Sequence, residues 1–316
     1  MITTTDAPPP TVDRWRPRRL RSGIDRAPRP NALYVLPAAL FFGTFAVLPV
    51  IGVAVLSFTT WNGLGDPQPA GLANWQRLFT DDTVLAATGT TVLLTVLCWA
   101  TQTPIALGLG VWAAGQQRNR AILSAVFFLP LLLSSAAIAL LWKSILDPNF
   151  GVAAKLGGYI GFPDGNIIGH PRGALACIVL TVAWQFVPFH ALLYQAGARN
   201  IPRVLYDAAV VDGVDRWEAF WHITLPQLRN TVITSSTLMI VGSLTYFETI
   251  LLLTNGGPGD ATHVLPFVMY VEGFRQYELS FAATIATVLV VFGTVLSLLI
   301  VRFSGFAKMR STLEGL

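Results

Sequence analysis

Residues 206–226, YDAAVVDGVDRWEAFWHITLP, form a charged segment between long apolar ones. In a chain that is only 12% charged, this segment carries Asp207, Asp212, Asp215, Arg216 and Glu218. Each ionised side chain costs about 2.5–3.5 kcal/mol or more in a bilayer core, so the segment must lie in water or against another protein. Its spacing predicts a helix over 204–211 after Pro202, a turn at Gly213, and a second helix over 217–222 that Pro226 ends.

The composition indicates a membrane protein. The 316 residues are 53% apolar, the mean hydropathy is +0.58, and the charged fraction is about half of the ~25% usual in soluble domains. Cys98 and Cys177 both fall inside apolar runs, without the spacing of a disulfide framework or a metal site. The net charge of +4 does not indicate nucleic-acid binding, because the basic residues follow a topological pattern instead.

Six apolar runs are long enough to cross the ~30 Å hydrocarbon core: 33–58, 85–114, 121–142, 174–197, 231–254 and 280–303. We therefore predict an all-α polytopic membrane protein with six transmembrane helices. Several prolines interrupt the runs, which a packed helix bundle tolerates when neighbouring groups bond the freed carbonyls. The run from Leu33 is longer than the apolar part of a signal peptide and is read as a retained anchor.

The distribution of basic residues predicts the orientation. With the N-terminus inside, the outer segments are 59–84, 143–173 and 255–279, and of the 21 Lys and Arg residues they contain only Arg77, Lys143, Lys155, Arg172 and Arg275. The positive-inside rule then places both termini and the 198–230 loop in the cytoplasm. We expect a disordered basic tail over 1–31, a six-span transmembrane domain over 32–305, and a cytoplasmic tail over 306–316.

Three short motifs resemble those of a known family. Asp207-Ala208-Ala209, Gly213 and Ile223-Thr224-Leu225-Pro226 have the spacing of the "EAA" loop of ABC-importer permeases, with Asp207 in place of the family's Glu. Leu253-Thr254-Asn255-Gly256-Gly257-Pro258 and Gly71-Leu72-Ala73-Asn74-Trp75 are similar to motifs of the carbohydrate (maltose-type) permeases. The resemblance covers residues 33–305.

The resemblance implies an importer type I permease fold and a permease subunit of a binding-protein-dependent, ATP-driven sugar importer in the bacterial plasma (inner) membrane. The implied partners are a second homologous permease, two cytosolic ABC ATPase subunits, an extracytoplasmic sugar-binding protein and membrane lipid. The sequence lacks a G-x-x-x-x-G-K-[ST] motif, so ATP and Mg would be bound by the ATPase partners and the chain itself would be no enzyme. The residues expected to couple to the ATPase are Asp207, Ala208, Ala209, Gly213, Ile223, Leu225 and Pro226.

Other interpretations of the loop stay open at this stage. An amphipathic helix on the membrane surface has a similar pattern, and the helix dipole alone favours a carboxylate at Asp207. Trp217, Phe220 and Trp221 suit either a protein interface or insertion into the lipid interface. The Gly256-Gly257-Pro258 stretch ends a helix at the outer rim, and predicts either an irregular gate or cap, or a plain turn.

A candidate substrate site lies in the fourth and fifth runs: Gln185, Phe189, Ser243, Tyr246 and Glu248. Ser243 and Tyr246 are three residues apart and predict one helical face with polar and aromatic groups, which suits a sugar. The resemblance implies the same two helices, and the absence of Arg and Lys from both runs favours a neutral sugar. The same polar side chains could instead form hydrogen bonds between helices.

Glu248 also supports a different function class, a secondary transporter driven by an ion gradient. That class typically shows inverted repeats and broken helices at matching positions, and no such symmetry is visible in the sequence. His190 is a lone imidazole in an apolar run and predicts packing rather than a metal site. No Ser-His-Asp or paired-carboxylate arrangement indicates a catalytic residue.

Overall fold

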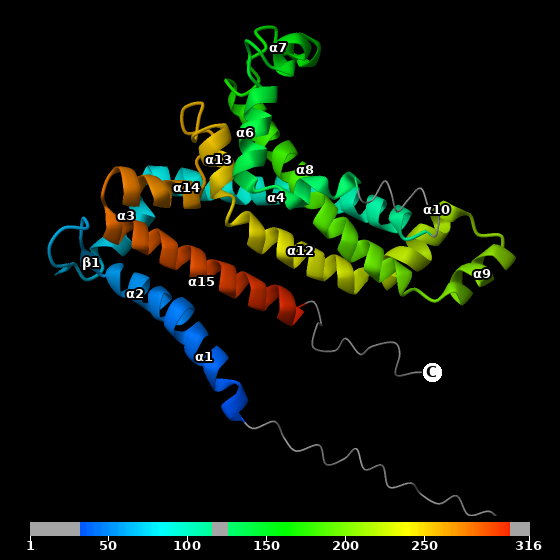
Figure 1. Ribbon diagram of the computed structural model, residues 1–316, viewed down its shortest axis with the longest axis horizontal. Coiled ribbons are helices and arrows are strands. Elements are labelled where there is room, and N and C mark those ends of the chain that lie inside the picture. Colours follow the sequence, from blue (N-terminus) through cyan, green and yellow to red (C-terminus); the bar gives the residue numbers. More distant parts are fainter. Residues whose placement is uncertain (1–31, 116–125, 304–316) are drawn as a thin grey trace, which may run out of the picture. The chain divides into compact units, whose positions relative to one another are not determined.

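The computed structural model describes residues 32–115 and 126–303, which are mostly helical (Figure 1). The exception is one antiparallel pair of two-residue strands, in which Thr59 lies opposite Pro69. The described residues divide into two units at Leu48, one of residues 32–48 and one that begins at Pro49. The elements are η1 (Ala32–Tyr34), α1 (Leu36–Phe42), η2 (Gly43–Val47), α2 (Leu48–Leu56), β1 (Thr59–Thr60), β2 (Gln68–Pro69), α3 (Ala73–Thr80), α4 (Asp82–Ala113), η3 (Leu129–Leu132), α6 (Ser135–Ile145), α7 (Val152–Leu156), η4 (Gly157–Ile160), α8 (Pro171–Arg199), α9 (Arg203–Val211), α10 (Arg216–Ala219), η5 (Phe220–Thr224), α11 (Leu225–Gln227), α12 (Arg229–Ser243), α13 (Phe247–Leu253), α14 (Leu265–Tyr270), η6 (Val271–Arg275) and α15 (Leu279–Phe303).

Four helical stretches in the described residues are long and apolar enough to cross a membrane: Leu36–Leu56, Asp82–Ala113, Pro171–Arg199 and Leu279–Arg302. They correspond to the first, second, fourth and sixth predicted runs. The fifth run is not the straight helix that the sequence predicts, because α12 and α13 meet at a bend of 51°. The third run begins outside the described residues, and its described part contains only the short helices η3 and α6. The tails 1–31 and 306–316 also lie outside the described residues.

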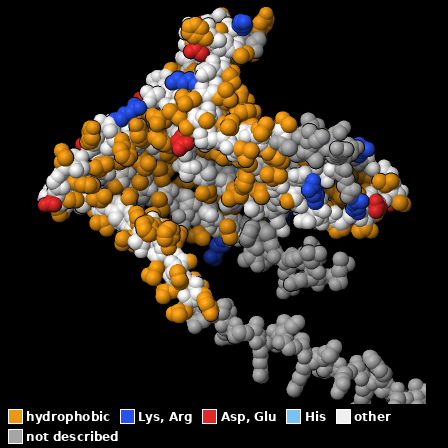
Figure 2. Space-filling model, in the orientation of Figure 1, with side chains coloured by type: hydrophobic (Ala, Val, Ile, Leu, Met, Phe, Trp, Pro, Cys, Tyr) orange, Lys and Arg blue, Asp and Glu red, His pale blue; other side chains and the backbone are white. Residues whose placement is uncertain are grey.

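The outer surface of the helices is apolar, as expected for a chain in lipid. Hydrophobic side chains cover much of the face in Figure 2, and only 11% of the most apolar window of α15 is buried. Inside the helices, hydroxyl groups bond to carbonyls of the preceding turn, as Thr91 Oγ1 does to Ala87 O at 2.6 Å. A polar side chain in an apolar solvent thereby keeps a hydrogen-bond partner.

Helices α4 and α8 pack closely from about Leu94 of α4 to its end at Ala113 (Figure 1), and their approach depends on Gly110. A Cβ atom on Gly110 would lie 2.6 Å from both the carbonyl oxygen of Ala191 and the Cβ of Tyr194. Gln195 on α8 donates a hydrogen bond from Nε2 to Ala113 O at 2.8 Å, which satisfies a carbonyl in the last turn of α4. These contacts join the two helices at the end from which α8 continues toward α9.

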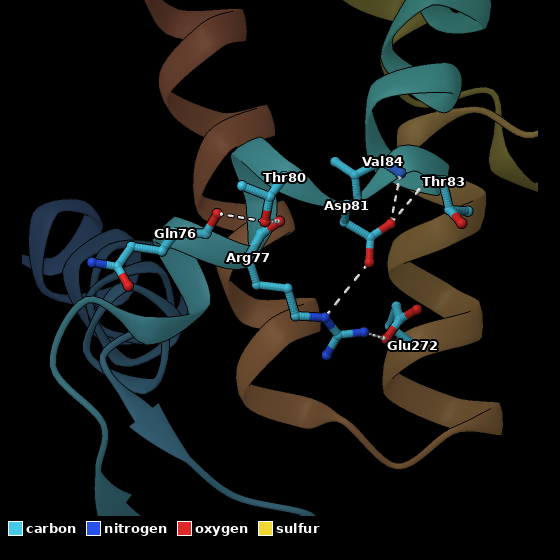
Figure 3. Close-up of polar contacts among 7 residues, drawn as sticks. All are labelled: Gln76, Arg77, Thr80, Asp81, Thr83, Val84 and Glu272. Carbon is cyan, nitrogen blue, oxygen red and sulfur yellow. Dashed lines mark hydrogen bonds and ion pairs between the residues drawn. The ribbon is translucent and has the colours of Figure 1, made fainter.

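At the other end of α4, an arginine links four elements (Figure 3). Arg77 on α3 pairs with Glu272 of η6 at 3.1 Å and lies 3.6 Å from the Asp81 carboxylate. Asp81 also caps α4, since its Oδ1 accepts from the amides of Thr83 and Val84 at 3.0 and 3.1 Å. The Arg77 guanidinium lies 3.7 Å from the centre of the Phe281 ring on α15. Burial raises the pKa of Glu272, while the neighbouring Arg77 charge lowers it to a smaller extent.

The Gly256-Gly257-Pro258 stretch turns the chain back onto the bundle. Asn255, Gly256 and Gly259 all have positive φ, and Thr254 Oγ1 lies 2.9 Å from Thr262 Oγ1 across the turn. The following helix α14 is largely buried, and the Leu265 amide donates to Thr91 Oγ1 at 2.9 Å. The segment is therefore a packed return against α4 and α15, not a plain surface turn.

The close approach at Gly110 gives a direct test of helix packing. We expect Gly110→Ala to destabilise the protein by about 1–3 kcal/mol, because the added methyl group meets backbone atoms that cannot move independently. The measurement is the thermal unfolding midpoint in detergent. The control is Gly108→Ala on the same helix, where a Cβ meets nothing within 4 Å. That change should be neutral or stabilising by up to ~1 kcal/mol, since alanine is the better helix former. Equal effects of the two substitutions would contradict the packing assigned to Gly110.

Candidate functional site

The loop after α8 folds as two helical arms joined by a turn. α9 runs from Arg203 to Val211, and Gly213 reverses the chain with a φ of +73°. Asp215 then starts α10 through a capping box: its Oδ1 accepts from the Trp217 and Glu218 amides at 2.8 and 2.7 Å. The predicted helix, break and helix are confirmed. The capping box was visible in the sequence as Asp215 three residues before Glu218, and the sequence analysis missed it.

The predicted stop at Pro226 is wrong. α10 passes into a π-helical turn, η5, then into α11 and, after Leu228, into α12. Pro226 occupies one of the first two positions of α11. A proline is tolerated there because a local π-helical turn, here η5 directly before it, can satisfy the carbonyl that the missing N–H leaves free. The second arm of the loop therefore continues directly toward the helix that carries Ser243.

The two arms are tied together near the bundle. Tyr206 Oη and Thr224 Oγ1 lie 2.9 Å apart, and the Val214 amide donates to Ala209 O at 2.9 Å. Among the expected coupling residues, Ala209 is buried, whereas Asp207, Ala208, Gly213 and Pro226 are exposed and Ile223 and Leu225 are half-buried. A Cβ on Gly213 would meet no atom within 4 Å, so the turn faces open space. The loop thus exposes an acidic side chain, Asp207, and a turn at Gly213.

A cavity of about 460 Å³ lies beside the break between α12 and α13. α12 ends at Ser243 and α13 starts at Phe247, so the intervening residues leave the helical path. Phe186 of α8 and Tyr246 form a stacked ring pair with centres 5.8 Å apart, and both line the cavity. The remaining lining residues are Leu131, Ser135, Phe189, His190, Leu238, Gly242, Thr245, Phe247, Glu248 and Thr249.

Only three of the five predicted substrate residues line the cavity. Phe189, Tyr246 and Glu248 line the cavity, and Glu248 is exposed. Gln185 is buried behind it, where its Nε2 donates to Ser135 Oγ at 3.1 Å and its Oε1 accepts no hydrogen bond from any described residue. Ser243 lies apart: its Oγ is 2.7 Å from Thr95 Oγ1 and donates to Ile240 O at 2.6 Å.

The single helical face proposed for Ser243 and Tyr246 is wrong, because the helix ends between them. Ser135, Thr245 and Thr249 line the cavity but were not among the predicted site residues. Ser135 belongs to the third apolar run, which contains no ionisable residue that would have suggested a site. His190 also borders the cavity, but it is buried and its Nδ1 lies 3.0 Å from Ser235 Oγ, which agrees with the predicted packing histidine. Among the described residues, no group of three or more His, Cys, Asp or Glu side chains could hold a metal ion.

Comparisons with known proteins agree with this architecture. A probable ABC transporter permease protein of Pyrococcus horikoshii is 31% identical over 269 residues, which are 84% of this chain and 92% of that protein. A trehalose/maltose transport system permease protein of Thermococcus litoralis is 30% identical, over 86% of this chain and 93% of its own. In the crystal structure of a bacterial ABC transporter involved in the import of the acidic polysaccharide alginate, one chain has the same fold, with a TM-score of 0.75 at 23% identity over 86% of this chain and 93% of that chain.

The model of one protein family, described as binding-protein-dependent transport system inner membrane component, matches residues 106–306. The match includes the 206–226 loop, the cavity and the helices that connect them. Members of this family are transport components without a cofactor of their own, and ATP is bound by their ATPase partners. The chain belongs to this family and is a multi-pass inner-membrane permease subunit of a binding-protein-dependent ABC importer.

Proposed function

We propose that the chain is a six-span permease subunit of an ATP-driven sugar importer, with both termini and the 198–230 loop in the cytoplasm. It pairs with a second homologous permease, two ATPase subunits and an extracytoplasmic sugar-binding protein. The positions of the apolar runs and of the arginines support the topology. The sugar class is supported by relatives named for trehalose and maltose in Thermococcus litoralis and for lactose in Rhizobium radiobacter.

The observation that carries the sugar assignment is the wall of the cavity at the helix break. The Phe186–Tyr246 stack offers an aromatic surface, and a sugar ring has apolar C–H faces that pack on such a surface. Glu248 and the hydroxyl groups of Ser135, Thr245 and Thr249 provide hydrogen-bonding groups around it. Gln185 lies behind this wall and donates from Nε2 to Ser135 Oγ at 3.1 Å, which positions that hydroxyl group.

The 206–226 loop is the proposed contact with the ATPase. Asp207 is exposed on α9 and forms no ion pair with another described residue, so its carboxylate is available to a basic group of a partner. η5 and α11 connect the loop to α12. A displacement of the loop would therefore move α12 and with it the helix break beside the cavity. Closure of the ATPase dimer on ATP would then open the cavity alternately to the two sides of the membrane.

An ion-coupled transporter would also use Glu248. Uptake by vesicles that contain the purified transporter distinguishes this function from ATP-driven import. With maltose, trehalose and lactose as probes, an ATP-driven importer accumulates sugar only with binding protein and ATP, is blocked by vanadate, and is insensitive to a protonophore. Collapse of uptake by the protonophore with ATP still present would support the ion-coupled function.

Charge reversal at Asp207 tests the coupling contact. We expect Asp207→Arg to weaken retention of the ATPase by about 30-fold or more, since loss of a hydrogen-bonded interface charge pair costs at least ~2 kcal/mol. The measurement is affinity purification of the complex from mild detergent with quantification of each subunit. Asp66→Arg, an exposed charge reversal in a predicted outer segment, is the matched control and should leave retention unchanged. Full retention in both variants would remove Asp207 from the contact.

Substitution of Tyr246 tests the cavity. We expect Tyr246→Ala to raise the KM for sugar uptake about 2–10-fold, because an aromatic pair contributes ~0.5–1.5 kcal/mol. Tyr246→Phe keeps the ring and should retain most of the affinity. Because Tyr246 is buried, the unfolding midpoint of each variant is measured alongside uptake. A lower midpoint with unchanged KM would assign Tyr246 to packing and place the sugar elsewhere in the pathway.

A further inference from the structure

A second and larger hollow lies between the bundle and the 206–226 loop. Its volume is about 1270 Å³, above the ~300–1,000 Å³ of ordinary small-molecule pockets. One wall is the last part of α4, including Pro104, Leu107 and Val111. At about 1.5 Å per residue, α4 extends ~14 Å from Pro104 to its end at Ala113, about half of the ~30 Å hydrocarbon core. The apolar wall of the groove is therefore about as long as the hydrocarbon layer of one lipid leaflet is thick.

The lining of this groove also includes basic residues. Arg199 from the end of α8, Arg203 from the start of α9 and Arg216 from the start of α10 all line it, and all three are exposed. Figure 2 shows Lys and Arg side chains beside hydrophobic ones at the end of the view that carries α9 and α10. None of the three arginines forms an ion pair with another described residue, and no described Asp or Glu lines the groove. Three positively charged residues thus line one groove without an acidic partner from the described part of the chain.

Aromatic side chains of the loop also line the groove. Trp217 is 68% exposed and Trp221 is 49% exposed, and both line the groove. Trp217 stacks on Phe220 with ring centres 5.9 Å apart, which holds the indole in place. Tryptophan is enriched at the level of lipid headgroups, because its ring is apolar and its N–H donates a hydrogen bond. The lining of the groove thus combines apolar, aromatic and basic side chains.

We propose that this groove is a binding site for an anionic phospholipid of the leaflet on the loop side. One acyl chain lies along Leu107 and Val111, and the headgroup phosphate is bound by Arg199, Arg203 and Arg216. Guanidinium groups bind phosphate oxygens through paired hydrogen bonds, and basic pockets at the ends of transmembrane helices select anionic headgroups. A neutral sugar would use neither three arginines nor a 14 Å apolar wall. A lipid in this position connects the bundle to the loop and supports the loop's position for the ATPase.

The test measures lipid retained by the intact transporter, purified and exchanged into nanodiscs of phosphatidylcholine with or without phosphatidylglycerol. After detergent extraction, native mass spectrometry counts the bound lipids. Wild type should retain phosphatidylglycerol in preference to phosphatidylcholine. Replacement of each groove arginine by Gln should weaken retention about fivefold, with the largest loss in the triple variant, since one basic group near an anionic surface contributes about that factor. The control Arg229→Gln with Arg302→Gln changes two exposed arginines outside the groove and should have no effect.

A steric pair of variants tests the apolar wall without changing charge. Gly108 lines the groove and a Cβ there meets nothing within 4 Å, so Gly108→Phe should fill the acyl path and reduce phosphatidylglycerol retention by a similar factor. Gly89, on the same helix and equally open, is outside the groove, and Gly89→Phe should retain lipid. An unfolding midpoint for each variant in lipid-free detergent identifies any that fails to fold.

Three results would overturn the proposal. The first is equal retention of phosphatidylglycerol in wild type and in the folded triple variant. The second is displacement of the lipid by inorganic phosphate or glycerol phosphate at the same concentration, which would indicate a site for a free anion. The third is a cysteine cross-link between the 116–125 segment and Leu107 that forms at the same rate with and without anionic lipid, which would show that the chain itself occupies the groove.

Discussion

The contact between α4 and α8 is the constraint on which the rest of the structure depends. Lipid tails are as apolar as the side chains they surround, so helices in a bilayer associate through close packing rather than through burial from water. Gly110 allows the backbone of α4 to reach Ala191, and Tyr194 beside it is fully buried. The hydrogen bond from Gln195 to Ala113 holds the ends of both helices together. This contact fixes the direction of α8 and therefore the positions of Arg199 and of the 206–226 loop that follows it. The basic groove lies next to the α4–α8 contact.

The second constraint is that backbone amides and carbonyls need hydrogen-bond partners where a helix breaks. In an apolar solvent each freed amide and carbonyl needs a partner, so irregular backbone occurs where protein or a cavity surrounds it. At the bend between α12 and α13, the Leu244 amide bonds to Val241 O at 3.2 Å and the Phe247 amide to Thr245 O at 2.7 Å, and Thr245 Oγ1 donates to Gly242 O at 2.7 Å. The break is thus internally satisfied and still leaves Tyr246 and Glu248 facing a cavity. The cavity beside the helix break is therefore also the proposed substrate site.

Local chemistry explains which predictions agree with the structure. A cluster of charged residues is costly in lipid, so the sequence predicts that the 206–226 loop lies outside the bilayer, and a glycine next to a helix end permits the positive φ that is found at Gly213. The effect of Pro226 depended on the turn before it. η5 is a π-helical turn through which the helix continues past the proline, and no residue in FWHIT predicts that geometry. The same limit applies to Ser243 and Tyr246, whose shared face exists only if α12 stays straight through Leu244.

The sequence by itself determined the class of the molecule: a polytopic helical membrane protein with a charged loop, in the family that this loop's motif resembles. These properties follow from composition and short spacing, which tertiary contacts do not alter. Only the tertiary structure decided that Ser135, Phe186, Tyr246 and Glu248 share one cavity while Ser243 bonds to Thr95 instead. It also decided that Arg199, Arg203 and Arg216 line one groove. The physical reason is that helix bends and interhelical approach depend on atoms far apart in the chain, such as those of Gly110 and Ala191, whose separation no local pattern encodes.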